Sequence, residues 1–318
     1  MNDPENFLPK KPHPLVNAFT DSLRDETNGI RSTKQLKSPK LQKLSQVLGW
    51  RNRFSQAELY PIDLALSGDI PDKKSSVFKF HVKQVQRGEI EETYGTGATV
   101  WPASMVLLKY LEHMVTKNDG KMWNFVGKTR GDSLNIGDLG AGTGVTSIAA
   151  AMLFEKSFVI CTDGCEKVVG LAKENIGNVG TLEGNGSYKL GSSLLRGSKY
   201  WWGDGTIVKE LHSFKGAGAC FDIILISDCV LPKLYPIAPL IDALDECMSV
   251  STIAYCTYEY RYYPDYDPKE HFIKLATQKG LLLTQIPTQD QHPIYSIDDI
   301  ELWEITRCTN SSKVNVVS

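Results

Sequence analysis

The chain has 318 residues, of which 42% are hydrophobic and 23% are charged, and its formal net charge is -2. This ordinary composition predicts a soluble globular protein with one large domain or two small ones. A charge near zero gives no global attraction to nucleic acid. No apolar run approaches the roughly 18 residues of a membrane span, and the first residues lack the apolar segment of a secretion signal. We therefore expect a cytoplasmic protein, with the nucleus as a second location, and neither nucleic acid nor membrane as a partner.

The cysteines and histidines favour neither a disulfide framework nor a metal site. Seven cysteines, an odd number, are scattered through the second half of the chain. Cys161, Cys229 and Cys256 lie in or next to apolar strand-like runs, which predicts buried free thiols. The six histidines are far apart in sequence, and none has the spacing of a zinc ligand.

The first part of the chain is less patterned than the rest. Residues 1–76 are rich in Lys, Pro, Ser and Asp, and we expect them to form a partly disordered extension. From Val77, the alternating segment 77–85 predicts a strand, with residues 90–101 as its antiparallel partner. Residues 104–115 then carry apolar side chains at helical spacing.

Strands and helices alternate through the remainder of the chain. The expected strands are 134–140, 158–163, 200–203, 221–227, 251–258, 281–287 and 300–308, and the expected helices are 145–154, 165–176, 237–248 and 268–280. The strand at 221–227 is apolar on both faces, as in a sheet between two helical layers. The last two strands have no helix between them and predict an antiparallel edge. We predict an α/β fold with a doubly wound, mostly parallel seven-stranded sheet, a domain over residues 77–308 and a disordered tail over 309–318.

The stretch DLGAGTG, residues 138–144, ends the first of these strands with three glycines. A phosphate-binding P-loop is excluded because its lysine is missing. A dinucleotide fingerprint is disfavoured because the third glycine, Gly144, comes one place early. Asp138 followed by G-x-G-x-G resembles motif I of the class I S-adenosylmethionine-dependent methyltransferases, which implies S-adenosylmethionine as cofactor. A tight strand-to-helix turn without a ligand remains the alternative.

The next two strand ends support a bound cofactor. Asp163 lies 19 residues after Gly144, close to the roughly 20-residue offset at which an acidic side chain meets ribose hydroxyls. Asp163 and Glu166 also fit a helix capping box, and the two roles are compatible. Trp202, after the third strand, is a candidate for stacking on adenine, and we interpret its neighbour Trp201 as a core residue.

Three longer segments give a narrower resemblance. TVWPASMVLLKYLE at 99–112, YWWGD at 200–204 and ISDCVLPKLYPIAPLIDAL at 226–244 are together similar to the seven-β-strand protein-lysine methyltransferases of methyltransferase family 16. The similarity covers about residues 77–308. It implies that the cofactor is bound by Trp101, Gly140, Ala141, Gly142, Asp163, Trp202 and Ser227.

The segment after the fourth strand departs from the family pattern. The family has Asp-x-x-Tyr/Phe, and this chain has Asp228 followed three residues later by Leu231. The resemblance implies that Asp228 is the catalytic residue, and we expect it to orient the arriving amine. Capping of the following helix is its alternative role. Tyr235 or a tyrosine of residues 258–263 is a candidate for the missing ring. Glu259 and Arg261 either line the site or pair on the surface, and we expect the second.

Together these features predict a protein-lysine N-methyltransferase that acts as a monomer on a protein with an accessible lysine. A small-molecule methyltransferase of the same fold is the nearest alternative, with the N-terminal residues as a source of the cap that would enclose its acceptor. A methyltransferase-like binding module without turnover is the third, because the ring is missing at Leu231. Methyl transfer needs no metal ion.

Overall fold

The computed structural model describes residues 50–51, 54–66, 76–85, 95–117, 128, 131–232, 234–264 and 266–308. All of them belong to one unit of the chain, Ser45–Ser318. The disorder expected near the two ends falls on residues 1–49 and 309–318, outside the described residues.

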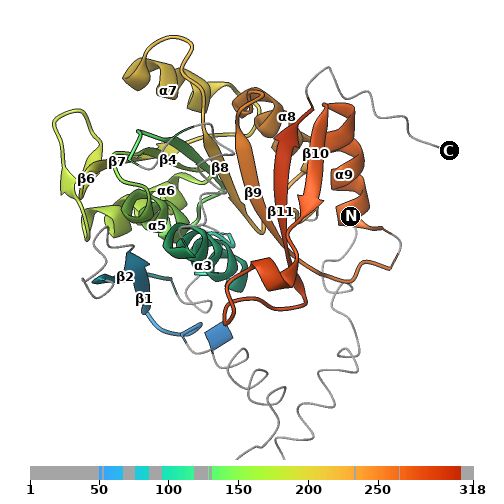
Figure 1. Cartoon of the computed structure of the whole chain (residues 1–318), viewed down its shortest axis with the longest axis horizontal. Helices are drawn as coiled ribbons and strands as arrows, with labels where there is room; N and C mark the ends of the chain where they lie inside the picture. The colour runs from blue at the N-terminus through green and yellow to red at the C-terminus, as the bar shows by residue number, and fades with distance from the viewer. Residues whose placement is uncertain are drawn as a thin grey trace, which may run out of the picture. The chain divides into compact units, whose positions relative to one another are not determined.

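A nine-stranded sheet forms the centre of this unit, in the order β10-β11-β9-β8-β3-β4-β7-β6-β5 (Figure 1). The strands are β3 (Asn135–Leu139), β4 (Phe158–Asp163), β5 (Thr181–Leu182), β6 (Tyr188–Leu190), β7 (Ser193–Lys199), β8 (Ile223–Ser227), β9 (Ile253–Glu259), β10 (Leu281–Gln285) and β11 (Ile300–Arg307). Strands β7, β4, β3, β8 and β9 run parallel, whereas β10 and β11 form the expected antiparallel edge. The predicted seven-stranded sheet is therefore present from β10 to β7, and the hairpin of β5 and β6 extends its far edge.

The third parallel strand lies earlier than predicted. β7 covers Ser193–Lys199, so the expected strand at residues 200–203 was wrong by a full strand length. The sequence SLLRGSK alternates buried and half-buried positions over most of its length, a weaker signal than the aromatic residues that follow it. As a consequence, residues 200–203 lie beyond the carboxyl end of β7, where ligands bind in such sheets.

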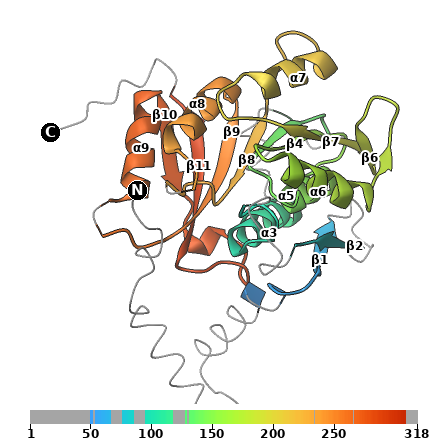
Figure 2. The same ribbon diagram turned by 180° about the vertical axis from the view of Figure 1, so that it is seen from behind.

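Helices cover both faces of the sheet. α3 (Pro102–Lys117), α5 (Val145–Leu153) and α6 (Glu166–Gly177) lie on one face, and α7 (Thr206–Lys215), α8 (Ile237–Cys247) and α9 (Pro268–Gln278) on the other (Figures 1 and 2). Each layer has its own apolar core against the sheet, as a doubly wound fold requires. The short 3-10 turn η2 (Thr288–Asp290) completes the elements. Within the described part of the chain, no helix is long and apolar enough to cross a membrane.

A separate two-stranded sheet packs beside α3. β1 (Leu59–Leu66) pairs antiparallel with β2 (Ser76–Lys83), so the partner expected for β2 at residues 90–101 was wrong. β1 buries Ile62 and Leu64 against the core, because every second residue of this strand is apolar. Residues of the expected N-terminal extension are thus part of the packed structure.

The cysteine prediction is confirmed. Cys161, Cys229 and Cys256 are buried, and their thiols are free. The other cysteines in the described part of the chain also form no disulfide.

Candidate cofactor and active site

The carboxyl ends of the parallel strands meet at a cavity of about 510 Å³. This volume is within the range of about 300 to 1,000 Å³ of small-molecule sites. All eight residues predicted from the sequence line it: Trp101, Gly140, Ala141, Gly142, Asp163, Trp202, Ser227 and Asp228. Residues from four strand ends and from the loop before α3 thus converge on one cavity.

The glycine loop after β3 has no room for side chains at two of its positions. A Cβ atom at Gly140 would lie 2.7 Å from the Cys229 sulfur, and one at Gly142 would lie 3.0 Å from the Gly97 carbonyl oxygen. Both glycines have positive φ angles, which other residues rarely adopt. α5 begins after Gly144 with no side-chain cap, so backbone N–H groups of its first turn remain available as donors. Such a cradle suits the carboxylate end of an amino-acid ligand.

Asp138 lies near the end of β3, just before this loop, and is fully buried. Its Oδ2 accepts a hydrogen bond of 2.6 Å from the Ser147 hydroxyl, and its Oδ1 has no hydrogen-bond partner in the described part of the chain. Burial raises the pKa of the Asp138 carboxyl to about 7, although the Ser147 hydrogen bond opposes the shift. A large share of Asp138 is therefore protonated near neutral pH.

Asp163 is oriented at the end of β4 by two backbone N–H groups. Its Oδ1 accepts from Cys165 at 3.0 Å and its Oδ2 from Gly142 at 3.3 Å. Burial raises the pKa of the Asp163 carboxyl. The capping box with Glu166 does not form, because α6 has Cys165 at its N-cap and no side-chain cap. The carboxylate is instead held at the cavity wall, where its remaining lone pairs can accept hydroxyl donors.

Both tryptophans after β7 line the cavity, which was expected for Trp202 but not for Trp201. Trp201 is 64% exposed and lines the cavity, so its interpretation as a core residue was wrong. Its ring lies 3.3 Å from the position of a Cβ atom at Gly164. Trp202 is half-buried and lies edge-on to the Tyr235 ring, with centroids 5.9 Å apart. Both indole rings are thus available to a ligand.

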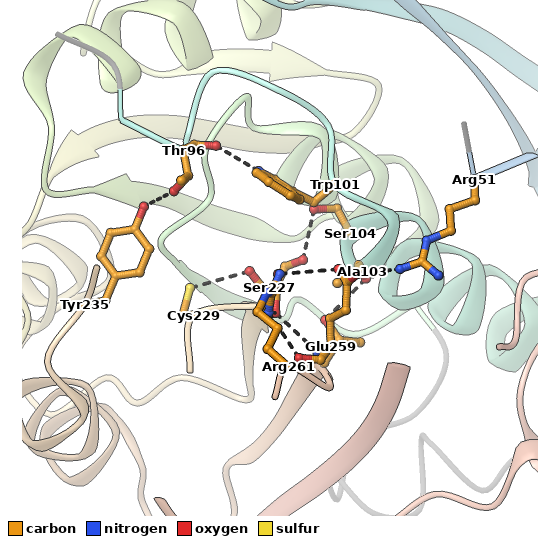
Figure 3. Close-up of polar contacts among 12 residues, drawn as sticks. Arg51, Thr96, Trp101, Ala103, Ser104, Ser227, Cys229, Tyr235, Glu259 and Arg261 are labelled. Carbon is orange, nitrogen blue, oxygen red and sulfur yellow. Dashed lines mark hydrogen bonds and ion pairs between the residues drawn. The ribbon is translucent and has the colours of Figure 1, made fainter. Parts of the chain in front are cut away.

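A hydrogen bond joins two loops on the cavity wall. The hydroxyls of Thr96 and Tyr235 bond to each other, and the Trp101 indole N–H donates to the Thr96 carbonyl at 2.8 Å (Figure 3). Burial raises the pKa of the Tyr235 hydroxyl, so it stays protonated. Sequence reasoning missed Thr96 and left Tyr235 unplaced. The glycines on either side of Thr96 were the available signal, because paired glycines are unusual in a strand.

The Asp228 carboxylate is bound by Arg261. Arg261 Nη1 donates to Oδ1 at 2.8 Å and Nη2 donates to Oδ2 at 2.5 Å, while the Glu259 backbone N–H donates to Oδ1 at 3.2 Å. The Asp228 side chain is only 4% exposed. The expected pair of Glu259 and Arg261 is present at 3.4 Å, but its side chains are 16% and 27% exposed and it lies beside the cavity wall more than on the open surface. Asp228 also does not cap a helix, since α8 has Pro236 at its N-cap. Asp228 itself has a φ angle of 56°, an unusual value for a residue other than glycine.

This ion pair continues away from the cavity. Glu259 lies 3.4 Å from Arg261 and pairs with Arg51 (Figure 3). Arg51 also pairs with Asp299 at 2.6 Å. Burial lowers the pKa of Arg261, but its hydrogen bonds to Asp228 oppose this effect. The net result is a pKa above the ordinary value, so the guanidinium stays charged. The chain of alternating charges links β9 to the segment before β1 and to the start of β11.

The Cys229 thiol on the cavity wall is unsuited to covalent catalysis as a thiolate. Cys229 is buried beside the glycine loop, and burial raises the pKa of its thiol well above the ordinary value. Among the described residues there is also no cluster of three or more His, Cys, Asp or Glu side chains that could hold a metal ion. The arrangement suits a reaction that depends on positioning.

A family model for lysine methyltransferases matches residues 79–279. This span is more than half of the chain. The chain belongs to the lysine methyltransferase family. S-adenosylmethionine is the cofactor of this family, and the glycine cradle and Asp163 fit its amino-acid and ribose parts.

Two curated relatives from different organisms share one name, protein-lysine methyltransferase METTL21E. This lysine methyltransferase family member is 30% identical to the protein-lysine methyltransferase METTL21E of Bos taurus over 153 residues, 48% of this chain and 43% of the relative. It is 37% identical to METTL21E of Mus musculus over 86 residues, 27% of this chain and 29% of the relative. The chain thus spans less than half the length of either relative.

Solved structures of low sequence identity are also similar. A TehB-like SAM-dependent methyltransferase from Corynebacterium glutamicum is 15% identical with a TM-score of 0.40, over 63% of this family member and 88% of that chain. A SAM-dependent methyltransferase from Agrobacterium tumefaciens is 14% identical with a TM-score of 0.41, over 79% and 70% of the two chains. Both similarities are too weak to bear on function.

Proposed function

We propose that the protein is an S-adenosylmethionine-dependent protein-lysine N-methyltransferase whose partner is a protein with an accessible lysine. The observation that supports this most strongly is the convergence of all eight predicted residues on one cavity. Family membership and the METTL21E relatives support lysine as the acceptor.

In this proposal the cofactor lies along the carboxyl edge of the sheet. The backbone of Gly140 and Gly142 and the first turn of α5 hold its amino-acid end. Asp163 accepts hydrogen bonds from the ribose hydroxyls, and the exposed ring of Trp201 or the half-buried ring of Trp202 stacks on adenine. When bound, the cofactor supplies the methyl group on a sulfonium.

The protein mainly has to align and desolvate the acceptor amine. A free lysine with a pKa near 10.4 must lose its proton at pH 7, which costs roughly 3.4 units or about 4.6 kcal/mol. Burial in the cavity and a nearby positive charge both disfavour the ammonium form and offset part of this cost. Near-attack alignment then contributes without any covalent enzyme intermediate.

Asp228 is better suited to positioning than to binding the amine directly. Arg261 already bonds both carboxylate oxygens, and the Glu259 N–H adds a third donor. These bonds hold the backbone of Asp228 at its unusual φ angle and so fix the direction of the loop that carries Leu231 and Tyr235. In this proposal Tyr235 supplies the aromatic wall that Leu231 lacks.

Transfer of a labelled methyl group tests the proposal. The full chain is incubated with tritiated S-adenosylmethionine and a cell extract, and the products are separated and hydrolysed. We expect label in polypeptides, recovered as methyl-lysine. Label in small molecules, or cofactor binding with no transfer in several extracts, would overturn the proposal in favour of a small-molecule methyltransferase or a binding module.

A matched pair of variants ties the label to the cavity. Gly140→Arg places a long side chain against Cys229 and should abolish both cofactor binding and transfer. Gly184→Arg is the control, because a Cβ atom there meets nothing within 4 Å. Equal loss in both variants would contradict the assignment of this cavity.

A further inference from the structure

Three tyrosines are exposed just past the carboxyl end of β9. Tyr260 is 61% exposed, Tyr262 is 74% exposed and Tyr266 is 39% exposed. We refer to these three residues as the tyrosine surface. Large aromatic side chains are seldom left in solvent together, and when they are, they commonly mark an interaction site.

The tyrosine surface adjoins the cofactor cavity. Arg261, between Tyr260 and Tyr262, binds Asp228 on the cavity wall. A second hollow of about 250 Å³ is lined by Glu259, the residue before Tyr260, and shares Trp101 with the main cavity. Tyr260 and Tyr262 are therefore sequence neighbours of one residue that lines a hollow and of one that binds the cavity wall.

The charges around this surface favour a basic partner. The backbone N–H of Tyr260 donates to the Asp299 carbonyl, and Lys269 pairs with Glu301, so the starts of β11 and α9 lie beside the tyrosine segment. The described residues of segments 259–271 and 298–301, taken with Arg51, carry three Lys or Arg side chains and six carboxylates. The carboxylates are Glu259, Asp267, Glu270, Asp298, Asp299 and Glu301.

We infer that the tyrosine surface is the docking site for a basic segment of the substrate polypeptide, next to its acceptor lysine. This inference rests on the proposed function and names the chemistry of the partner. Exposed tyrosine rings attract Lys and Arg side chains through their faces, and the surrounding carboxylates add long-range attraction. The cavity then receives one lysine while its basic neighbours lie on the rings.

Peptide binding tests the inference independently of methyl transfer. The probes are a fluorescein-labelled 15-residue peptide of alternating Lys, Gly and Ser and its counterpart with Glu in place of Lys. Anisotropy is measured with the full chain and saturating S-adenosylhomocysteine. We expect the Lys peptide to bind, the Glu peptide not to bind, and the affinity to fall as NaCl is raised.

A double substitution locates the binding surface. Tyr260→Ser with Tyr262→Ser should raise the Kd of the Lys peptide about fivefold to thirtyfold, from the loss of two cation-π contacts. The control is Leu182→Ser with Val250→Ser, which removes two equally exposed apolar side chains, on β5 and before β9. Cofactor affinity should be unchanged in both double variants.

The outcomes separate the inference from the proposed function. No binding of the Lys peptide, or equal affinity for it in the two double variants, overturns the docking surface even if the chain methylates lysine. Tyrosine-dependent binding of the Lys peptide with no methyl-lysine in any extract supports the surface and overturns the proposed function.

Discussion

Arg261 bonds both carboxylate oxygens of Asp228, the residue that the sequence marks as catalytic. The pair joins β9 to the loop after β8, which carries part of the cavity wall. The Asp228 side chain is almost fully buried, and Arg261 is the charged group that donates to both of its oxygens. We therefore expect the Asp228 carboxylate to fix the geometry of the site.

Removing the partner should destabilise the fold. We expect Arg261→Gln to lower the free energy of unfolding by about 2 kcal/mol, since a buried carboxylate loses its charged donors. The loss is smaller than the roughly 3 to 5 kcal/mol of a fully buried pair, because the Arg261 side chain is 27% exposed and solvent screens its charge. Chemical denaturation of both proteins measures the difference.

An exposed ion pair provides the comparison. Lys199 and Glu166 lie 3.4 Å apart with side chains 46% and 84% exposed. Lys199→Gln should change the free energy of unfolding by no more than about 0.5 kcal/mol. If the two substitutions cost the same, the Asp228 and Arg261 pair has no special role in the fold.

The aromatic wall of the cavity should control turnover of the acceptor. Tyr235→Ala removes a ring that lies edge-on to Trp202, and we expect kcat/KM for a protein substrate to fall about tenfold or more, which is about 1.4 kcal/mol. Tyr235→Phe keeps the ring and loses only the bond to Thr96, so its effect should be severalfold smaller. Cofactor affinity serves as the check, and equal losses in the two variants would point to the hydroxyl instead of the ring.

The sequence was sufficient for the fold class and for bringing the eight predicted residues to one cavity. Strand ends of a parallel sheet meet at one edge, so Gly140, Asp163 and Ser227 could be placed together from their positions after predicted strands. Contacts between elements far apart in sequence were not predictable in the same way. The bond between Thr96 and Tyr235 and the pairing of Arg261 with Asp228 depend on how loops fold back, and no local pattern encodes that.

The limits of local sequence patterns also explain three wrong predictions. β1 was missed because its partner β2 follows a long connection and the preceding residues have a low-complexity composition. The position predicted for β7 was wrong because the strand alternates only between buried and half-buried residues. The aromatic run after it has a more strand-like composition. Trp201 was taken for core because apolar side chains usually are, although the edge of a binding cavity is the common exception.

Asp138 should make stability depend on pH. Burial raises the pKa of its carboxyl from the ordinary 3.8 to about 7, so between these pH values the folded chain keeps a proton that the unfolded chain has lost. The contribution of Asp138 to the free energy of unfolding is fully present below about pH 4. It is lost as the pH rises to about 7, at up to 1.36 kcal/mol per pH unit.

A neutral replacement should remove this dependence. We expect Asp138→Asn to gain stability relative to the original chain as the pH is raised from 5 to 7.5, measured by denaturation at each pH. Asp290→Asn, in an exposed turn, is the control and should leave the pH profile unchanged. Parallel profiles for the original chain and Asp138→Asn would show that Asp138 is charged throughout.

Two glycines with similar backbone angles separate strain from close contact. Gly142 has φ 56° and Gly191 has φ 60°, so a change to alanine costs each about 1 kcal/mol of backbone strain. A Cβ atom at Gly142 would also lie 3.0 Å from the Gly97 carbonyl oxygen, whereas one at Gly191 meets nothing within 4 Å. Gly142→Ala should therefore destabilise the fold more than Gly191→Ala and weaken cofactor binding about tenfold, because the loop must move. Calorimetric titration with S-adenosylhomocysteine measures the affinity. Equal affinities in the two variants would mean that the loop tolerates a side chain and that the cofactor is held elsewhere.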